Sequence, residues 1–167
     1  AKAQFALGLM YELGEGTDKN LPKALEWHKK AAEKAIGDAQ LKLAQFYEKG
    51  IPELNLKEDQ ELAFKWYHSA ATNNLVAAQV QVGSRFEEGI GVSKNPGQAV
   101  KWYGKAVDQG SAEGEWLLGK LYYKGIRTGI DKAKAIKLLE SSAKRGVFNS
   151  QLELGKIYHL DKTWNRA

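Results

Sequence analysis

The sequence predicts an all-α solenoid built from helix-turn-helix repeats of about 36 residues. An aromatic residue recurs at intervals of 36, 39, 36 and 36, and a small residue lies three positions before each: Tyr11, Tyr47, Phe86, Tyr122 and Tyr158, with Gly8, Ala44, Gly83, Gly119 and Gly155. An alanine keeps the spacing 39, 36 and 36, at Ala24, Ala63, Ala99 and Ala135. Self-similarity of fixed period marks stacked two-element units. The shared interval of 39 places three extra residues in one loop of the second unit.

The first repeat is expected to begin with a helix over about residues 2–13. Its apolar and small side chains fall on one stripe at helical spacing: Ala3, Leu7, Gly8 and Tyr11. Gly14 and Gly16 end this helix, because glycine adopts the backbone of a helix stop without steric penalty. A second helix begins near Asn20 and Leu21, with Pro22 suited to its first turn.

The same pattern predicts the later helices at 38–49, 58–73, 75–88, 96–108, 111–124, 131–144 and 148–160. Asn95 and Pro96 form a cap followed by a first-turn proline, and the insertion occupies 51–55. The repeats are therefore about 1–37, 38–74, 75–110, 111–147 and part of a fifth at 148–167, in a single solenoid that we expect to be a fragment of a longer repeat protein. No useful alternation of period two occurs, so we expect no sheet.

The recurring small residues predict close helix packing. A glycine inside a helix costs about 1 kcal/mol relative to alanine, and four glycines share one register: Gly8, Gly83, Gly119 and Gly155. The common cause that we expect is the close approach of a neighbouring helix backbone, with the recurring alanines at the facing position.

These landmarks resemble the Sel-one-like repeat (SLR) family, a relative of the tetratricopeptide repeat. The family pattern runs roughly A-x-x-x-L-G-x-x-Y-x-x-G-x-G, a loop, and K-A-x-x-W-Y-x-K-A-A. Residues 3–16 read A-Q-F-A-L-G-L-M-Y-E-L-G-E-G, and residues 23–32 read K-A-L-E-W-H-K-K-A-A. The match covers nearly the whole chain. Its departures are mild: Ala44 for Gly, Phe86 for Tyr, and Leu138-Leu139 for Trp-Tyr.

The resemblance implies a right-handed superhelix whose first helices line a concave face. It also implies a non-catalytic adaptor that binds a peptide segment or a folded protein, in a bacterial envelope, secretion or host-interaction setting. The alternative is a regulatory or inhibitory repeat domain that controls a partner enzyme, such as a cell-wall enzyme.

No residue pattern favours an enzyme, a cofactor or a metal. The histidines, His28, His68 and His159, occupy different repeat positions without a second ligand at metal-binding spacing, so structural or surface roles are favoured. Glu87 and Glu88 diverge by about 100° around a helix axis and do not share a face. The glycine-rich segments at 14–16 and 89–91 follow helices rather than strands, which favours helix stops over phosphate loops.

Charge is uneven along the chain. The net charge of +5 divides into +7 for residues 116–167, with 11 Lys/Arg against 4 Asp/Glu, and −2 for the rest. The basic end could attract a partner with an acidic segment, and a solvated lysine-rich surface explains the same composition. Nucleic acid is disfavoured, because Trp116 and Tyr122 fall on repeat positions that pack. No apolar run is long enough to span a membrane. The absence of cysteine fixes no compartment, and we favour a periplasmic or secreted bacterial location over a cytoplasmic one.

The expected binding surface lies on the first helix of each repeat. The residues after the small and after the aromatic position should face the inner groove, and their variation on a fixed scaffold is where specificity would lie. The candidate residues are Leu9, Glu12, Gln45, Glu48, Ser84, Glu87, Lys120, Tyr123, Lys124, Lys156 and His159.

Overall fold

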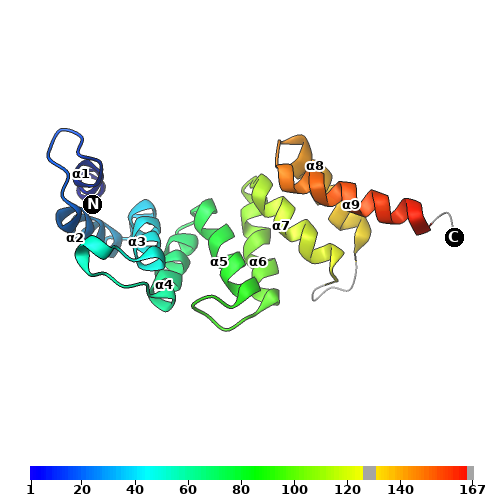
Figure 1. Ribbon diagram of the computed structural model, residues 1–167, viewed down its shortest axis with the longest axis horizontal. Helices are drawn as coiled ribbons and strands as arrows, with labels where there is room; N and C mark the ends of the chain where they lie inside the picture. Colours follow the sequence, from blue (N-terminus) through cyan, green and yellow to red (C-terminus); the bar gives the residue numbers. More distant parts are fainter. Residues whose placement is uncertain (126–130, 165–167) are drawn as a thin grey trace. The chain divides into compact units, whose positions relative to one another are not determined.

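The computed structural model describes residues 1–125 and 131–164, with side chains described up to residue 159 (Figure 1). Every regular element in these ranges is helical, which confirms the all-α prediction. The elements are α1 (Lys2–Leu13), α2 (Leu21–Glu33), α3 (Gly37–Lys49), the 3₁₀ turn η1 (Pro52–Leu54), α4 (Gln60–Thr72), α5 (Val76–Glu88), α6 (Pro96–Asp108), α7 (Ala112–Tyr123), α8 (Lys132–Lys144) and α9 (Phe148–Trp164). The end of the predicted fifth repeat, residues 165–167, lies outside the described residues.

The chain forms two compact units, Ala1–Lys94 and Asn95–Ala167. In the first unit, α1 packs on α2, α2 on α3, α3 on α4 and α4 on α5. In the second unit, α6 packs on α7, α7 on α8 and α8 on α9. We call α1, α3, α5, α7 and α9 the first helices, and α2, α4, α6 and α8 the second helices.

Side-chain caps fix where the second helices begin. The side chain of Asn20 accepts a hydrogen bond from the backbone N–H of Lys23 at 3.0 Å, and Asn95 accepts one from Gln98 at 3.1 Å. Asp59 and Asp131 cap α4 and α8 in the same way. Each cap satisfies a backbone donor that has no partner inside the helix. Because Asp59 is the cap, α4 begins at Gln60, two residues later than the sequence pattern predicts.

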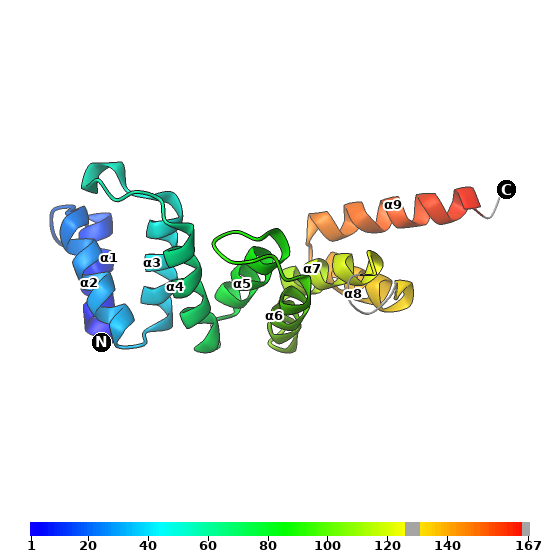
Figure 2. The same ribbon diagram turned by 90° about the horizontal axis from the view of Figure 1, so that it is seen from below.

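The inserted loop of the second repeat is a small closed structure. The backbone N–H of Ile51 donates to the carbonyl of Leu56 at 2.8 Å, and Leu56 donates back to Ile51 at 3.1 Å. The turn η1 fills the space between them. The loop begins at Gly50, where φ is +67° and an added Cβ would lie 2.7 Å from the Leu56 carbonyl oxygen. Only glycine fits there without strain, and the loop projects beyond the ends of α3 and α4 (Figure 2).

Gly8 and Gly119 lie against second helices, but what they meet differs. At Gly119, an added Cβ would lie 3.1 Å from the backbone oxygen of Ala135 and 3.0 Å from Leu139, which is the backbone approach that the sequence predicts. At Gly8, it would lie 2.7 Å from the imidazole of His28, so a side chain takes up the space there. Gly155 is exposed, with no described atom within 4 Å of its Cβ position.

A glutamine joins each repeat to the one before it at three of the junctions. The amide nitrogens of Gln40, Gln79 and Gln151 donate to the backbone carbonyls of Ala32, Ala71 and Ala143, each eight residues earlier, at 3.1, 3.4 and 3.3 Å. These carbonyls lie in the last turns of second helices, where intrahelical partners are missing. Glu115 takes this position in the fourth repeat and instead accepts a hydrogen bond from Ser141 at 2.9 Å.

Candidate protein-interaction surface

Glu12 lies in an ionic cluster between the first two repeats. One of its carboxylate oxygens is 3.1 Å from Nε2 of His28 on α2, and the other is 2.8 Å from Nζ of Lys42 on α3. His28 is fully buried between the rings of Phe5 and Phe46, at centroid distances of 5.4 and 5.7 Å. Burial lowers the pKa of His28 below its ordinary value of 6.5, against an opposing contribution from Glu12. Both oxygens of the Glu12 carboxylate are thus occupied within the molecule.

Glu48 occupies the equivalent position of the second repeat and forms a comparable cluster. It accepts a hydrogen bond from the hydroxyl of Tyr67 at 2.7 Å and pairs with the guanidinium of Arg85 at 2.6 Å. Arg85 is 3% exposed, lies 4.6 Å from the centre of the Tyr67 ring and donates to Gln60 at 3.0 Å. Burial, followed by the contact with Glu48, raises the pKa of the Tyr67 phenol.

The repeat register explains why these clusters match. His28, Tyr67, Tyr103 and Leu139 lie at one repeat position on the second helices, and all four are buried. In the fourth repeat, the second helix carries Leu139 at this position. On the first helices, a carboxylate occupies one repeat position in the first three repeats, as Glu12, Glu48 and Glu87, and the second helices of these repeats carry a polar ring. Tyr123 replaces the carboxylate in the fourth repeat, where the second helix carries leucine.

The other predicted surface residues differ in exposure. Leu9, Gln45, Ser84, Glu87, Lys120 and Tyr123 are half-buried, and Lys124, Lys156 and His159 are exposed. Lys120 lies over the ring of Trp116 at 5.7 Å, and Lys156 pairs with Glu153 at 3.1 Å. These side chains divide between the two units, with Leu9 to Glu87 on the first and Lys120 to His159 on the second.

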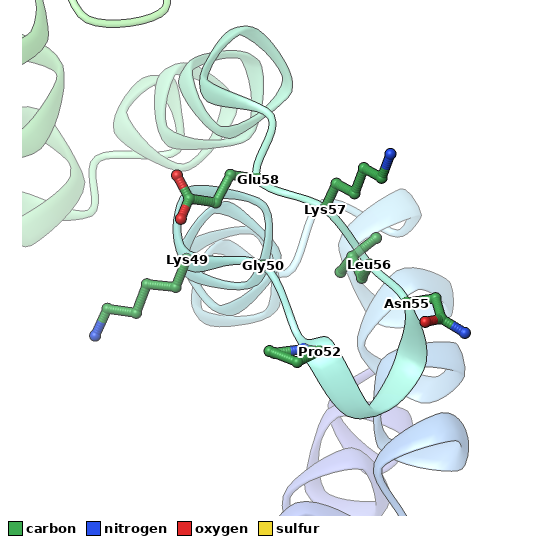
Figure 3. Close-up of a pocket in the computed structure, with 7 residues that line it drawn as sticks. All are labelled: Lys49, Gly50, Pro52, Asn55, Leu56, Lys57 and Glu58. Atoms are coloured by element: carbon green, nitrogen blue, oxygen red, sulfur yellow. The ribbon is translucent and has the colours of Figure 1, made fainter.

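Three hollows surround the inserted loop. The first, about 600 Å³, lies on the loop itself and is lined by Lys49, Gly50, Pro52, Asn55, Leu56, Lys57 and Glu58. Figure 3 shows the chain leaving α3 at Gly50 and returning through Leu56, with the side chains of Lys49 and Lys57 pointing to opposite sides. The second, about 410 Å³, lies between residues 19–22 and Glu53 and Leu54.

The third hollow, about 440 Å³, brings two of the predicted residues together. Its lining consists of Glu12, Leu13, Lys19, Leu21, Lys42, Gln45, Phe46, Lys49, Gly50 and Ile51. We call it the α1–α3 groove. Glu12 and Gln45 were predicted as surface residues, whereas Leu13, Lys19 and Lys49 were not. The signal that could have found them is the insertion, because a loop present in one repeat alone alters the surface beside it.

The comparisons with known proteins fit this architecture. The family model for the Sel1 repeat matches residues 1–35, 37–75, 76–111 and 112–147. The chain belongs to the Sel1 repeat family. Proteins of this family generally act as protein-interaction scaffolds, and the fold is typically non-catalytic.

Two solved structures are similar over nearly the whole chain. One is a Sel1 repeat protein from Oxalobacter formigenes, with 36% identity and a TM-score of 0.81, covering 94% of this chain and 63% of that one. The other is c5321, a protective antigen of uropathogenic Escherichia coli with an SLR fold, with 32% identity and a TM-score of 0.85, covering 96% of this chain and 34% of that one.

A curated relative is the chitin synthase regulatory factor 3 of Schizosaccharomyces pombe, which is 39% identical over 100 residues. The match covers 59% of this chain and 11% of that protein, so the chain spans about a tenth of the length of this relative. Within the described residues, none of the helices has the length and apolar character needed to cross a membrane.

Proposed function

We propose that this Sel1 repeat chain is a non-catalytic adaptor that holds a peptide segment or a folded protein against its first helices. The observation that carries the proposal is variation at one register position on a repeated scaffold. The residue after the small position is Leu9, Gln45, Ser84, Lys120 and Lys156 in successive repeats. The packing position directly before it stays small, as glycine or alanine, in all five repeats. Variable polar groups on rigid helices are suited to selecting a partner.

The two units would contribute different chemistry to binding. On the first unit, Glu12 and Glu48 already have internal ionic partners, so Gln45 and Ser84 are the better candidates for direct partner contacts. On the second unit, Lys120, Lys124 and Lys156 form a basic set that would attract an acidic segment of the partner. Screening limits such attraction to about 8 Å at physiological salt, so the association rate should fall as salt rises.

Affinity capture with matched variants tests the proposal. The whole chain serves as bait in native lysate of the source cells, and captured proteins are quantified by mass spectrometry. The first-helix variants are Gln45→Lys with Ser84→Lys, and Lys120→Glu with Lys124→Glu. The control is Lys65→Glu with Lys101→Glu, at exposed positions on α4 and α6. We expect at least one protein to be lost with a first-helix variant and kept with the control. The reverse ranking would contradict the proposal.

A second candidate function is regulation of a partner enzyme, such as a cell-wall enzyme. The observation that favours it is the 39% identity to a protein named as a regulatory factor of chitin synthase. If the chain regulates an enzyme, a captured partner should change its turnover when the purified chain is added. If the turnover rate of the enzyme is unchanged at a saturating concentration of the chain, the regulatory function is contradicted and the adaptor function is not affected.

The bacterial envelope, secretion or host-interaction setting belongs to this proposal as well. It is supported by the bacterial sources of the two similar structures. The fungal relative points to a different setting. Capture from bacterial and from fungal lysates, with the same variants, distinguishes the bacterial setting from the fungal one.

A further inference from the structure

The α1–α3 groove has an apolar floor that is open to solvent. Four apolar side chains line it, and they come from α1, the first residue of α2, α3 and the start of the insertion: Leu13, Leu21, Phe46 and Ile51. Leu13 is 59% exposed and Ile51 is 8% exposed, so Leu13 is the side chain of this floor that is most open to a partner. At about 440 Å³, the groove is large enough for one or two side chains of a partner.

The insertion builds one end of this groove. Ile51 lines it and is held in place by its two backbone hydrogen bonds with Leu56. Beyond it, Glu53 and Leu54 reach residues 19–22 of the first repeat across the neighbouring hollow. The spacing of 36 residues in the other repeats shows that they carry no such insertion. The groove is thus specific to the junction of the first and second repeats.

The charge available in the groove is positive. Glu12 is the one carboxylate in the lining, and both of its oxygens are engaged by His28 and Lys42. Lys19 and Lys49 lie in the same lining and are exposed. Neither forms an ion pair with any residue that the structure describes. Two lysines without an ion pair therefore line the groove together with its apolar residues.

We propose that the α1–α3 groove binds an extended segment of a partner protein in which an apolar side chain lies between carboxylates. The apolar side chain covers Leu13 and Phe46, and the carboxylates pair with Lys19 and Lys49. The argument for this occupant is charge complementarity, because the apolar floor and the two free lysines together select that pattern over a basic or a wholly apolar one. The inference rests on the proposed protein-binding function and names the partner chemistry for one site.

A display library of random twelve-residue peptides, selected on the full chain, tests this inference. We expect the enriched peptides to carry Asp or Glu around an apolar residue. By fluorescence anisotropy, Lys19→Glu with Lys49→Glu should weaken their binding about tenfold, since two charge pairs are lost and repulsion replaces them. The matched control, Lys65→Glu with Lys101→Glu, changes net charge equally and should leave binding unchanged.

The apolar half of the site has its own pair of variants. Leu13→Ser should weaken the same peptides severalfold, whereas Leu152→Ser on α9, where the side chain is 48% exposed, should not. Both leucines are exposed, so neither change should unfold the chain. Circular dichroism verifies that each variant keeps the helicity of the parent.

Three outcomes would overturn the inference: no enriched peptide, enriched peptides without an excess of acidic residues, or binding that the groove variants leave unchanged. If enriched peptides lose binding with Lys120→Glu and Lys124→Glu instead, the groove assignment fails while the adaptor function stands. If lysate capture shows no first-helix dependence at all, the adaptor function itself fails.

Discussion

Adding one methyl group at the same repeat position should have opposite effects in α7 and α9. Gly119 and Gly155 are 36 residues apart and lie inside these two helices. An added Cβ at Gly119 would be 3.0 Å from Leu139 and 3.1 Å from the backbone oxygen of Ala135. The same atom at Gly155 would have no described neighbour within 4 Å. The pair therefore separates helix propensity from packing within one chain.

The expected magnitudes follow from two opposing effects. Alanine stabilises a helix interior by about 1 kcal/mol relative to glycine, so Gly155→Ala should raise stability by about 0.5–1 kcal/mol. At Gly119 the same gain is opposed by overpacking, which typically costs about 1–3 kcal/mol. The cost should be expressed in full, because Leu139 is fully buried and the Ala135 oxygen belongs to the backbone of α8. We expect Gly119→Ala to lower stability by about 1 kcal/mol, and Gly119→Leu by more.

Amide hydrogen exchange measures the effect where it arises. Repeats can open separately, so the protection of amides in α7 and α9 is more informative than one global midpoint. Protection in α7 should fall in Gly119→Ala, and protection in α9 should rise in Gly155→Ala. An equal rise in both helices would mean that Gly119 does not contact α8, and the register of the fourth repeat would be wrong.

Three other predictions follow from the clusters and the insertion. Lowering the pH through 6.5 should destabilise the first unit, because burial holds the pKa of His28 below that of the unfolded chain, which therefore takes up the proton first. This pH dependence should weaken in His28→Tyr, which has the same amino acid at this repeat position as the second repeat has at Tyr67. An equal pH dependence in the variant would assign the effect to another group. Arg85→Leu should lower the free energy of unfolding, measured in urea, by about 2 kcal/mol. This loss is smaller than for a fully buried ion pair, because the Glu48 side chain is 32% exposed. An unchanged free energy of unfolding would mean that the ion pair does not stabilise the fold. Deleting residues 53–55 should leave the helicity and the melting midpoint nearly unchanged, because the other repeats close the same connection without these residues. The deletion should also abolish the selection of acidic peptides. Loss of folding would show that the loop supports the repeats.

Much of the fold could be predicted from the sequence, because its determinants are local and repeated. Three examples are the asparagine cap at Asn95, the glycine helix stops and the small residue at Gly119. Each acts through neighbours at a fixed spacing. A repeat presents these features several times, so an accidental match at one position is corrected by the others. The insertion was located in the same way, as a departure from the period.

The ionic clusters could not be predicted, because they depend on side chains from three different helices. Glu12 was expected to face the inner groove. Its partners, His28 and Lys42, lie 16 and 30 residues away and belong to different repeats. Arg85 occupies a position that is apolar in the other repeats, so its charge becomes interpretable only beside Glu48.

The residues that line the α1–α3 groove could be predicted in part, for a related reason. The register predicted that Gln45 faces the inner groove, and in the structure Gln45 lines the α1–α3 groove. Leu13, Lys19 and Lys49 lie in or beside loops, where the period carries no information on side-chain direction. Their convergence results from how the insertion folds against the first repeat.

Site-specific photo-crosslinking in the source cells most directly tests whether a partner protein binds the first helices. A photoreactive amino acid replaces Gln45 or Lys120 on first helices, and Lys65 or Lys101 on second helices, one site at a time in the whole chain. We expect discrete protein adducts from Gln45 or Lys120 and none from the second-helix positions. Adducts from Lys65 or Lys101 alone, or no adduct from any of the four positions, would contradict the proposed binding face.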